Sequence, residues 1–181
     1  DSVNQLLFSL KLTAHAAHDI TTDEIAKKAF KTIEETSQNA VNEMRALIWQ
    51  LKPVGLEQGM LHALNHYSEL LQLNLTVHVD GLIDVTNMIE ENVYRMVQEC
   101  LNNVRKHAHT KEVTLTLKQT NEKLYVIVQD EGKGFDNEKQ TSNTANGLKH
   151  LQQRTDILKG QLRIYSKPSK GTRIEIEIPL N

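Results

Sequence analysis

The sequence predicts an α+β protein in which an antiparallel helical hairpin precedes a layered α/β sandwich. Up to Leu51, apolar and small residues recur at alternating spacings of four and three, a pattern typical of packed helices. Pro53 and Gly55 then stop the second helix, because proline lacks a backbone donor and disfavours helix at the preceding residue. Beyond them, helical segments and alternating strands mix without strict order, which favours a mainly antiparallel sheet covered by helices. We therefore expect two domains, residues 1–54 and 55–181.

The amino-terminal hairpin is predicted to be half of a four-helix bundle. Its first helix ends at about His18, before a polar break at residues 19–23, where Thr21, Thr22 or Asp23 could cap the second helix. The two seams consist of Val3, Leu7, Leu10, Ala14 and Ala17, followed by Ala26, Phe30, Ile33, Ser37, Ala40, Met44, Leu47 and Leu51. A single hairpin covers only one side of such seams, so pairing with a second copy predicts a homodimer.

The carboxy-terminal part is predicted to hold three helices and five strands. Periodicity assigns the helices to residues 56–71, 89–104 and 148–158, and the strands to residues 73–79, 113–117, 124–128, 162–165 and 173–178. A segment rich in Gly and Asn at 131–146 interrupts the periodicity before the last helix.

Composition limits the class of function. Lys and Arg number 21 against 23 Asp and Glu, a net charge of −2, so no global positive field is available to hold nucleic acid. The one cysteine, Cys100, excludes an internal disulfide and suits a core position in a reducing compartment. No apolar run reaches the roughly 20 residues that cross a bilayer. We therefore expect this chain to be cytoplasmic, with no nucleic-acid partner and no membrane contact of its own.

A first candidate motif lies at the end of the long predicted helix. Glu99, Asn103 and either Lys106 or His107 share one helical stripe. Carboxylate and amide oxygens are suitable ligands for Mg²⁺, and the cationic groups could contact phosphate. On its own, this stripe equally fits a solvated helix face.

Three further motifs follow along the chain. The segment DEGKGF at 130–135 comes directly after a strand, so Asp130 could accept from an exocyclic amine while Gly132 and Gly134 let the backbone approach a ligand. Gly147 and Leu148 stand at a predicted helix start, where free amides favour anions. The last motif, SKGT, ends at residue 172 between the closing strands. Each motif alone also fits an ordinary turn or cap.

In this order, the four motifs resemble the nucleotide-binding boxes of the GHKL ATP-binding fold, over residues 56–181. The resemblance implies that Asp130 binds the adenine amine with support from Thr172, and that Gly132 and Gly134 let the loop pass over base and ribose. It also implies that Asn103 coordinates Mg²⁺ and that Glu99 helps to order metal-bound water or the attacking group. Lys106 and His107 would contact phosphate oxygens, and Gly147 with Leu148 would form a lid that closes on the nucleotide.

The first residues, DSVNQ, are similar to the tail of the HDxxxQ motif in the NarX, DesK and LiaS-like branch of bacterial sensor histidine kinases. The resemblance implies that the phosphoacceptor histidine immediately precedes Asp1. Asp1 would then act as the general base, and Gln5 would orient a water that removes phosphate from the partner protein. We accordingly expect this chain to bind Mg-ATP without phosphorylating itself.

Membership of this branch implies an ATP-dependent protein-histidine kinase, with phosphatase activity, that passes phosphate to an aspartate of a response regulator of the NarL/LuxR-like type. It also implies a longer parent protein anchored in the bacterial membrane. One alternative is a GHKL ATPase or an anti-sigma serine kinase, but such proteins have no reason to carry the hairpin seam with Asp1 and Gln5. Another is a non-catalytic dimerisation and interaction module whose nucleotide pocket is degenerate. The presence of Glu99, Asn103, Asp130 and Thr172 argues against that alternative.

Overall fold

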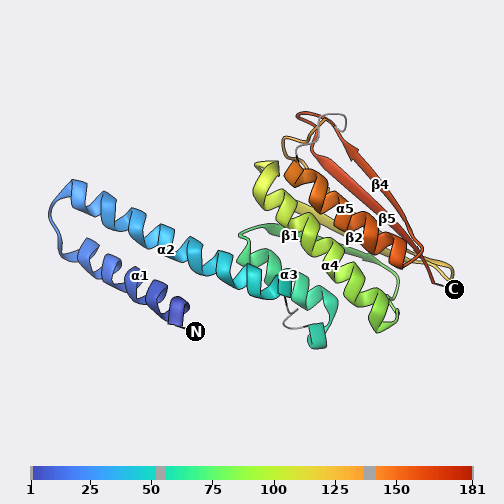
Figure 1. The fold of residues 1–181 in the computed structure, drawn as a ribbon, viewed down its shortest axis with the longest axis horizontal. Helices are drawn as coiled ribbons and strands as arrows, with labels where there is room; N and C mark the ends of the chain where they lie inside the picture. Colours follow the sequence, from blue (N-terminus) through green and yellow to red (C-terminus); the bar gives the residue numbers. More distant parts are fainter. Residues whose placement is uncertain (1, 52–55, 137–141, 181) are drawn as a thin grey trace. The chain divides into compact units, whose positions relative to one another are not determined.

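The computed structural model describes residues 2–51, 56–136 and 142–180. The chain divides into two compact units, Asp1–Lys52 and Pro53–Asn181. Its helices and mixed sheet confirm the predicted α+β class (Figure 1). Among the described residues, no helix combines the length and the apolar character needed to cross a bilayer.

The first unit is an antiparallel pair of helices, α1 (Ser2–Ile20) and α2 (Glu24–Leu51), which pack along their length (Figure 1). Asp23 is the N-cap of α2, because its Oδ1 accepts from the amide of Ile25 at 2.8 Å and from that of Ala26 at 3.4 Å. Helix α1 continues two residues beyond the end predicted at His18, so the connection is shorter than expected.

Packing of α1 on α2 covers only part of the predicted seam. Ala14 and Ser37 are buried between the helices, at 4% and 3% exposure. Val3 and Leu10 were predicted in the same seam but remain 51% and 48% exposed. Other large apolar side chains exposed on the hairpin are Leu6, Phe8, Leu12, Ile20, Ile25 and Ile33. The hairpin therefore keeps several apolar side chains in contact with solvent, among them Val3, Leu6 and Leu10 on one stripe of α1.

The second unit is a five-stranded sheet with helices on one face (Figure 1). Its elements are η1 (Leu56–Gln58), α3 (Met60–Leu70), β1 (Asn74–Asp80), α4 (Asn87–Asn103), the π-helical turn η2 (Val104–Ala108), β2 (Glu112–Gln119), β3 (Lys123–Asp130), α5 (Ser142–Ile157), β4 (Gln161–Ser166) and β5 (Thr172–Pro179). The strand order is β1-β2-β3-β5-β4, with β1 parallel to β2 and every other pair antiparallel. The mainly antiparallel sheet is therefore as predicted.

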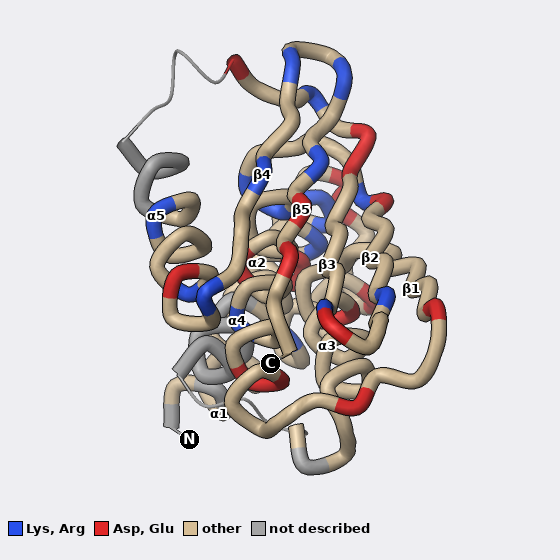
Figure 2. The backbone as a smooth tube through the Cα atoms, turned by 90° about the vertical axis from the view of Figure 1, so that its right-hand side faces the viewer, with Lys and Arg blue, Asp and Glu red and all other residues tan. Residues whose placement is uncertain are grey.

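Alternate strand residues build the core against the helices. Leu117, Val126 and Ile176 are in register across three strands, and each is at most 1% exposed. The opposite face of the sheet carries charges, and Figure 2 shows acidic and basic segments side by side on β3, β4 and β5. There Glu177 pairs with Lys123 and with Arg163, each at 3.0 Å. Such exposed pairs contribute little stability, so the apolar layer holds this unit together.

Two predicted helix starts are wrong. Leu56 belongs to the 3₁₀ turn η1, and α3 begins only at Met60 because Gly59, with φ +99°, breaks the helical path. The last helix, predicted from about Leu148, begins earlier, at Ser142. Gly147 and Leu148 therefore lie inside α5, and no helix N-terminus forms at them.

The capping of α2 generates a prediction. Asp23→Ala removes the carboxylate that accepts from two orphan amides, so we expect the hairpin to lose about 0.5–2 kcal/mol of stability. Asp23→Asn keeps an acceptor at the same place and should retain most of it. Urea unfolding followed by far-ultraviolet circular dichroism measures both variants, and equal stability of the two would contradict the capping role.

Candidate functional site

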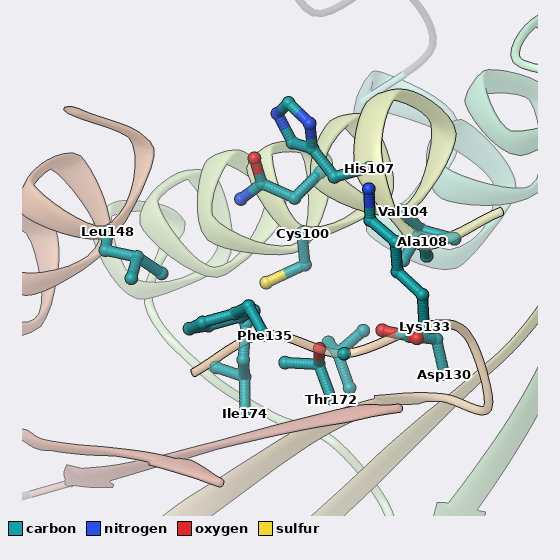
Figure 3. Close-up of a pocket in the computed structure, with 13 residues that line it drawn as sticks. Cys100, Val104, His107, Ala108, Asp130, Lys133, Phe135, Leu148, Thr172 and Ile174 are labelled. Carbon is teal, nitrogen blue, oxygen red and sulfur yellow. The ribbon is translucent and has the colours of Figure 1, made fainter. Parts of the chain in front are cut away.

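A cavity of about 220 Å³ opens between the helical layer and the ends of β3 and β5. Figure 3 shows Asp130, Thr172 and Ile174 on its sheet side and Cys100, Val104, Ala108 and His107 on its helical side. The remaining lining residues are Asn103, Val128, Lys133, Gly134, Phe135 and Leu148. Of the predicted site residues, the cavity thus brings together Asn103, His107, Asp130, Gly134, Leu148 and Thr172.

Asp130 is a buried hydrogen-bond acceptor at the sheet side of this cavity. It ends β3 opposite Thr172, the first residue of β5, and is 7% exposed. Its Oδ1 accepts from the amide of Gly132 at 2.8 Å, and the Thr172 amide also donates to the carboxylate. Burial raises the pKa of Asp130, an effect that these two amides only partly offset. The carboxylate is therefore short of donors, and a ligand amine would supply one.

The loop after β3 is fastened to the end of the helical turn η2. The amide of Lys133 donates to the carbonyl of Ala108 at 2.7 Å. Gly132 lies so close to Ala108 that a Cβ at that position would overlap its carbonyl oxygen. Glycine is needed at 132 for this close approach, although the residue does not itself line the cavity.

The middle of the cavity is apolar. Cys100, Val104 and Ala108 recur every four residues along α4 and η2, opposite Ile174 of β5. Phe135 and Leu148 lie at one end of this slot (Figure 3). Such walls accept a flat, weakly polar group such as a heterocyclic base.

Two nitrogen-bearing side chains at the cavity are those of His107 and Lys133. Figure 3 shows the Lys133 side chain extending along the edge of the cavity towards His107. Burial lowers the pKa of His107, and the nearby Lys106 and Lys133 lower it further. The neutral imidazole and the ammonium group can both donate a hydrogen bond to an anion.

Lys106 does not line this cavity. The chain passes from α4 into the π-helical turn η2 after Asn103, which changes the angular spacing of the side chains. His107 consequently lines the candidate site, while Lys106 lines a separate hollow with Arg105, His109 and Lys111. The sequence left Lys106 and His107 as alternatives for the stripe, and only His107 reaches the cavity in this structure.

Glu99 and Gly147 meet beside Asn103, next to the cavity. A Cβ built on Gly147 would stand 2.5 Å from Oε1 of Glu99 and 3.4 Å from the amide group of Asn103. Gly147 is thus a contact point of α5 on α4, which explains why a glycine stands inside the helix. The amide nitrogen of Asn103 is buried and has no hydrogen-bond partner among the described residues. A ligand at the cavity could satisfy it.

The two predicted residues of the first helix belong to the other unit. Asp1 lies outside the described residues, and Gln5 is exposed on α1. In the parts of the chain that the structure describes, no group of three or more His, Cys, Asp or Glu side chains could hold a metal by itself. Any divalent ion here would depend on ligand oxygens as well as on protein groups.

Sequence reasoning missed several lining residues. Lys133 and Phe135 stand within the DEGKGF segment, where alternation with the glycines was the available signal. Cys100 and Val104 were assigned to the core face of their helix, and the fourfold spacing that continues to Ala108 could have indicated a shared wall. Together the groups form an apolar slot with a buried acceptor on one side and the hydrogen-bond donors of His107 and Lys133 at its edge. A nucleotide with an amino group on its base has the matching chemistry.

Comparison with known families agrees with this geometry. Residues 88–181 match the family described as histidine kinase-, DNA gyrase B- and HSP90-like ATPase. Residues 1–56 match a second family described as histidine kinase, HisKA_3. Solved structures share the fold: the histidine kinase domain of the blue-light activated kinase EL346 from Erythrobacter litoralis aligns with a TM-score of 0.56 at 18% identity, covering 97% of this chain and 94% of that one.

Curated relatives are similar along almost the whole chain. Sensor histidine kinase YhcY of Bacillus subtilis is 39% identical over 182 residues, which cover 99% of this chain and 48% of YhcY. DegS of Brevibacillus brevis, named a signal transduction histidine-protein kinase/phosphatase, is 32% identical over 97% of this chain and 46% of its own length. This chain thus spans about half the length of these relatives. It belongs to the histidine kinase-, DNA gyrase B- and HSP90-like ATPase family, and its curated relatives are named sensor histidine kinases.

Proposed function

We propose that this chain is the dimerising and catalytic core of a two-component sensor kinase. It binds Mg-ATP, and the γ-phosphate passes to a histidine immediately before Asp1 and then to an aspartate of a response regulator. The observation that carries the proposal is the buried, donor-poor carboxylate of Asp130 at an apolar slot edged by His107 and Lys133. An ATPase-family match over this unit supports ATP as the nucleotide.

The base occupies the apolar slot in this proposal. Asp130 accepts from the exocyclic amine, and Thr172 adds a second oxygen on the same wall. Phe135 and Leu148 exclude water from the open end, while Gly134, with φ +57°, lets the loop turn beside the ligand. Gly132 contributes indirectly, by allowing the loop to lie against Ala108.

The phosphates extend towards His107, Lys133 and Asn103. Magnesium, when bound, neutralises part of the phosphate charge. Asn103 fits such a group, because its carbonyl oxygen can coordinate the metal while its unpartnered amide nitrogen donates to a phosphate oxygen. Glu99, which lies near Asn103, would help to order metal-bound water or the attacking group. Lys106 lines a separate hollow, so its side chain would have to move before it could contact the phosphates. Gly147 and Leu148 lie inside α5, so a lid that they form would move together with that helix.

The hairpin supplies the dimer and the phosphotransfer face. Asp1 is assigned as the general base for the proposed acceptor histidine, and Gln5, exposed on α1, as the group that orients water for dephosphorylation. The kinase/phosphatase name of DegS supports the second activity. The regulator is of the NarL/LuxR-like type, and the parent protein is anchored in the membrane. The apolar stripe with Val3, Leu6 and Leu10 supports a second copy as the occupant of that surface.

A phosphotransfer assay tests the activity. With ATP labelled on its γ-phosphate, we expect no label on this chain, because its first histidine in sequence is His15, well beyond the assigned base. A chain extended upstream through the residue before Asp1 should gain acid-labile phosphate, and replacing a histidine found there should abolish it. Label on His15 or His18 of the present chain would contradict the assignment.

Asp130→Asn tests the nucleotide site. The variant replaces a charged acceptor by a neutral amide, so we expect ATP affinity to fall by at least about tenfold in calorimetric titration. An unchanged dissociation constant would remove Asp130 from the site.

The same variant also tests how the Asp130 carboxylate affects the stability of the fold. Because the pKa of Asp130 is raised in the folded state, its carboxylate destabilises the fold above that pKa, and this cost is relieved as pH falls through it. We therefore expect Asp130→Asn to unfold at a higher temperature than the parent chain at pH 7. The difference should vanish below about pH 4, where the unfolded aspartate is also protonated. A lower melting temperature at pH 7 would mean that the carboxylate stabilises the fold instead.

Leu10→Glu tests the dimer. A charge on the exposed apolar stripe of α1 would be buried without a partner in a four-helix bundle, so we expect a monomer where the parent chain sediments as a dimer. Ala16→Glu places the same charge on a different exposed face of α1 and should leave the dimer intact. Equal masses for both variants would argue against this face as the interface.

A further inference from the structure

Ser166 stands behind the candidate site at the end of β4 and does not line the cavity. Its hydroxyl nevertheless touches three groups that shape the cavity. Oγ accepts from the amide of Phe135 at 2.9 Å, donates to the carbonyl of Gly171 at 3.0 Å, and lies 3.1 Å from Oγ1 of Thr172. One serine thus joins the loop after β3 to the start of β5.

Counting hydrogens at Ser166 fixes the direction of the Thr172 hydroxyl. A serine hydroxyl has one hydrogen and two acceptor lone pairs. The Gly171 carbonyl can only accept, so it takes the hydrogen, and the Phe135 amide can only donate, so it takes one lone pair. The contact with Thr172 is then possible only if the Thr172 hydroxyl donates to Ser166. The hydrogen of the Thr172 hydroxyl therefore points to Ser166, and the lone pairs of Oγ1 are available to accept from a ligand in the cavity.

Two acceptors therefore stand side by side on one wall of the site. Asp130 and Thr172 are direct partners in the β3–β5 register, and Figure 3 shows them adjacent. Neither presents a hydrogen to the ligand, since Asp130 is a carboxylate and the Thr172 hydrogen points to Ser166. An edge that donates, such as an aromatic amine, matches this wall, whereas a carbonyl in the same place would face like partial charge.

We propose that Ser166 is a positioning residue for base selectivity: by holding the Thr172 hydroxyl as an acceptor, it favours a 6-aminopurine over a purine with hydrogen or oxygen at that carbon. The proposal rests on the proposed nucleotide site and adds the residue that orients it. Through Phe135, Ser166 also holds the loop at the mouth of the base slot.

The loop has a second attachment, so removal of the hydroxyl leaves the fold in place. The amide of Ser169 donates to the carbonyl of Lys133 at 2.6 Å, and the β4–β5 ladder pairs every residue of β4 from Gln161 up to this contact. Ser166→Ala is therefore expected to fold, with a circular dichroism spectrum like that of the parent chain.

The test compares three nucleotides that differ only at the base: ATP, purine riboside triphosphate, which lacks the amine, and inosine triphosphate, which has a carbonyl there. For the parent chain we expect both analogues to bind at least about tenfold more weakly than ATP. In Ser166→Ala the freed Thr172 hydroxyl can rotate to donate, so this discrimination should shrink by about threefold or more. Ser166→Thr keeps the hydroxyl and should restore it.

Ser169→Ala is the matched control, because Ser169 lies in the same turn and contacts the loop through its backbone. It should leave the discrimination unchanged. If Ser166→Ala weakened all three nucleotides by one common factor, or changed none of them, the positioning role would be overturned. Failure of the parent chain to bind ATP would instead defeat the proposed function, and with it this extension.

Discussion

Burial of the Asp130 carboxylate between β3 and β5 is the constraint on which the rest of the site depends. A carboxylate removed from water needs donors, and backbone amides of Gly132 and Thr172 are those at hand. To aim both amides, β3 and β5 must be neighbours and the loop must reverse immediately after Asp130. The strand order and the glycine at 132 can both be understood as conditions for placing one charged group at the end of an apolar slot.

The π-helical turn η2 performs the complementary task on the helical side. It ends α4 without leaving the wall of the cavity, so Cys100, Val104 and Ala108 form one continuous surface. Its last carbonyl holds the loop that follows Asp130 through the amide of Lys133. The two sides of the slot are therefore joined by a main-chain hydrogen bond, which uses no side-chain atoms.

Much of this arrangement was accessible from the sequence. Alternation and helical spacing predicted the five strands and five α-helices but neither η1 nor η2, and the order of the motifs placed Asn103, Asp130 and Thr172 around one cavity. Periodicity gave wrong assignments where the course of the backbone departs from a regular α-helix or where a helix begins earlier than its apolar pattern. The π turn separates Lys106 from His107, and the extension of α5 to Ser142 turns Gly147 from a helix start into a packing contact. Neither event has a signal in apolar spacing, because both depend on how α4 meets its neighbours.

The position of Cys100 has a consequence for inhibitor chemistry. Its thiol lines the base slot but is only 2% exposed, and burial raises its pKa, with Glu99 and Asp130 adding to the effect. The thiol therefore stays protonated at neutral pH and is a poor nucleophile. Compounds that carry an electrophile for this cysteine would meet an inert sulfur, so drug design against this pocket should rely on reversible occupancy and shape.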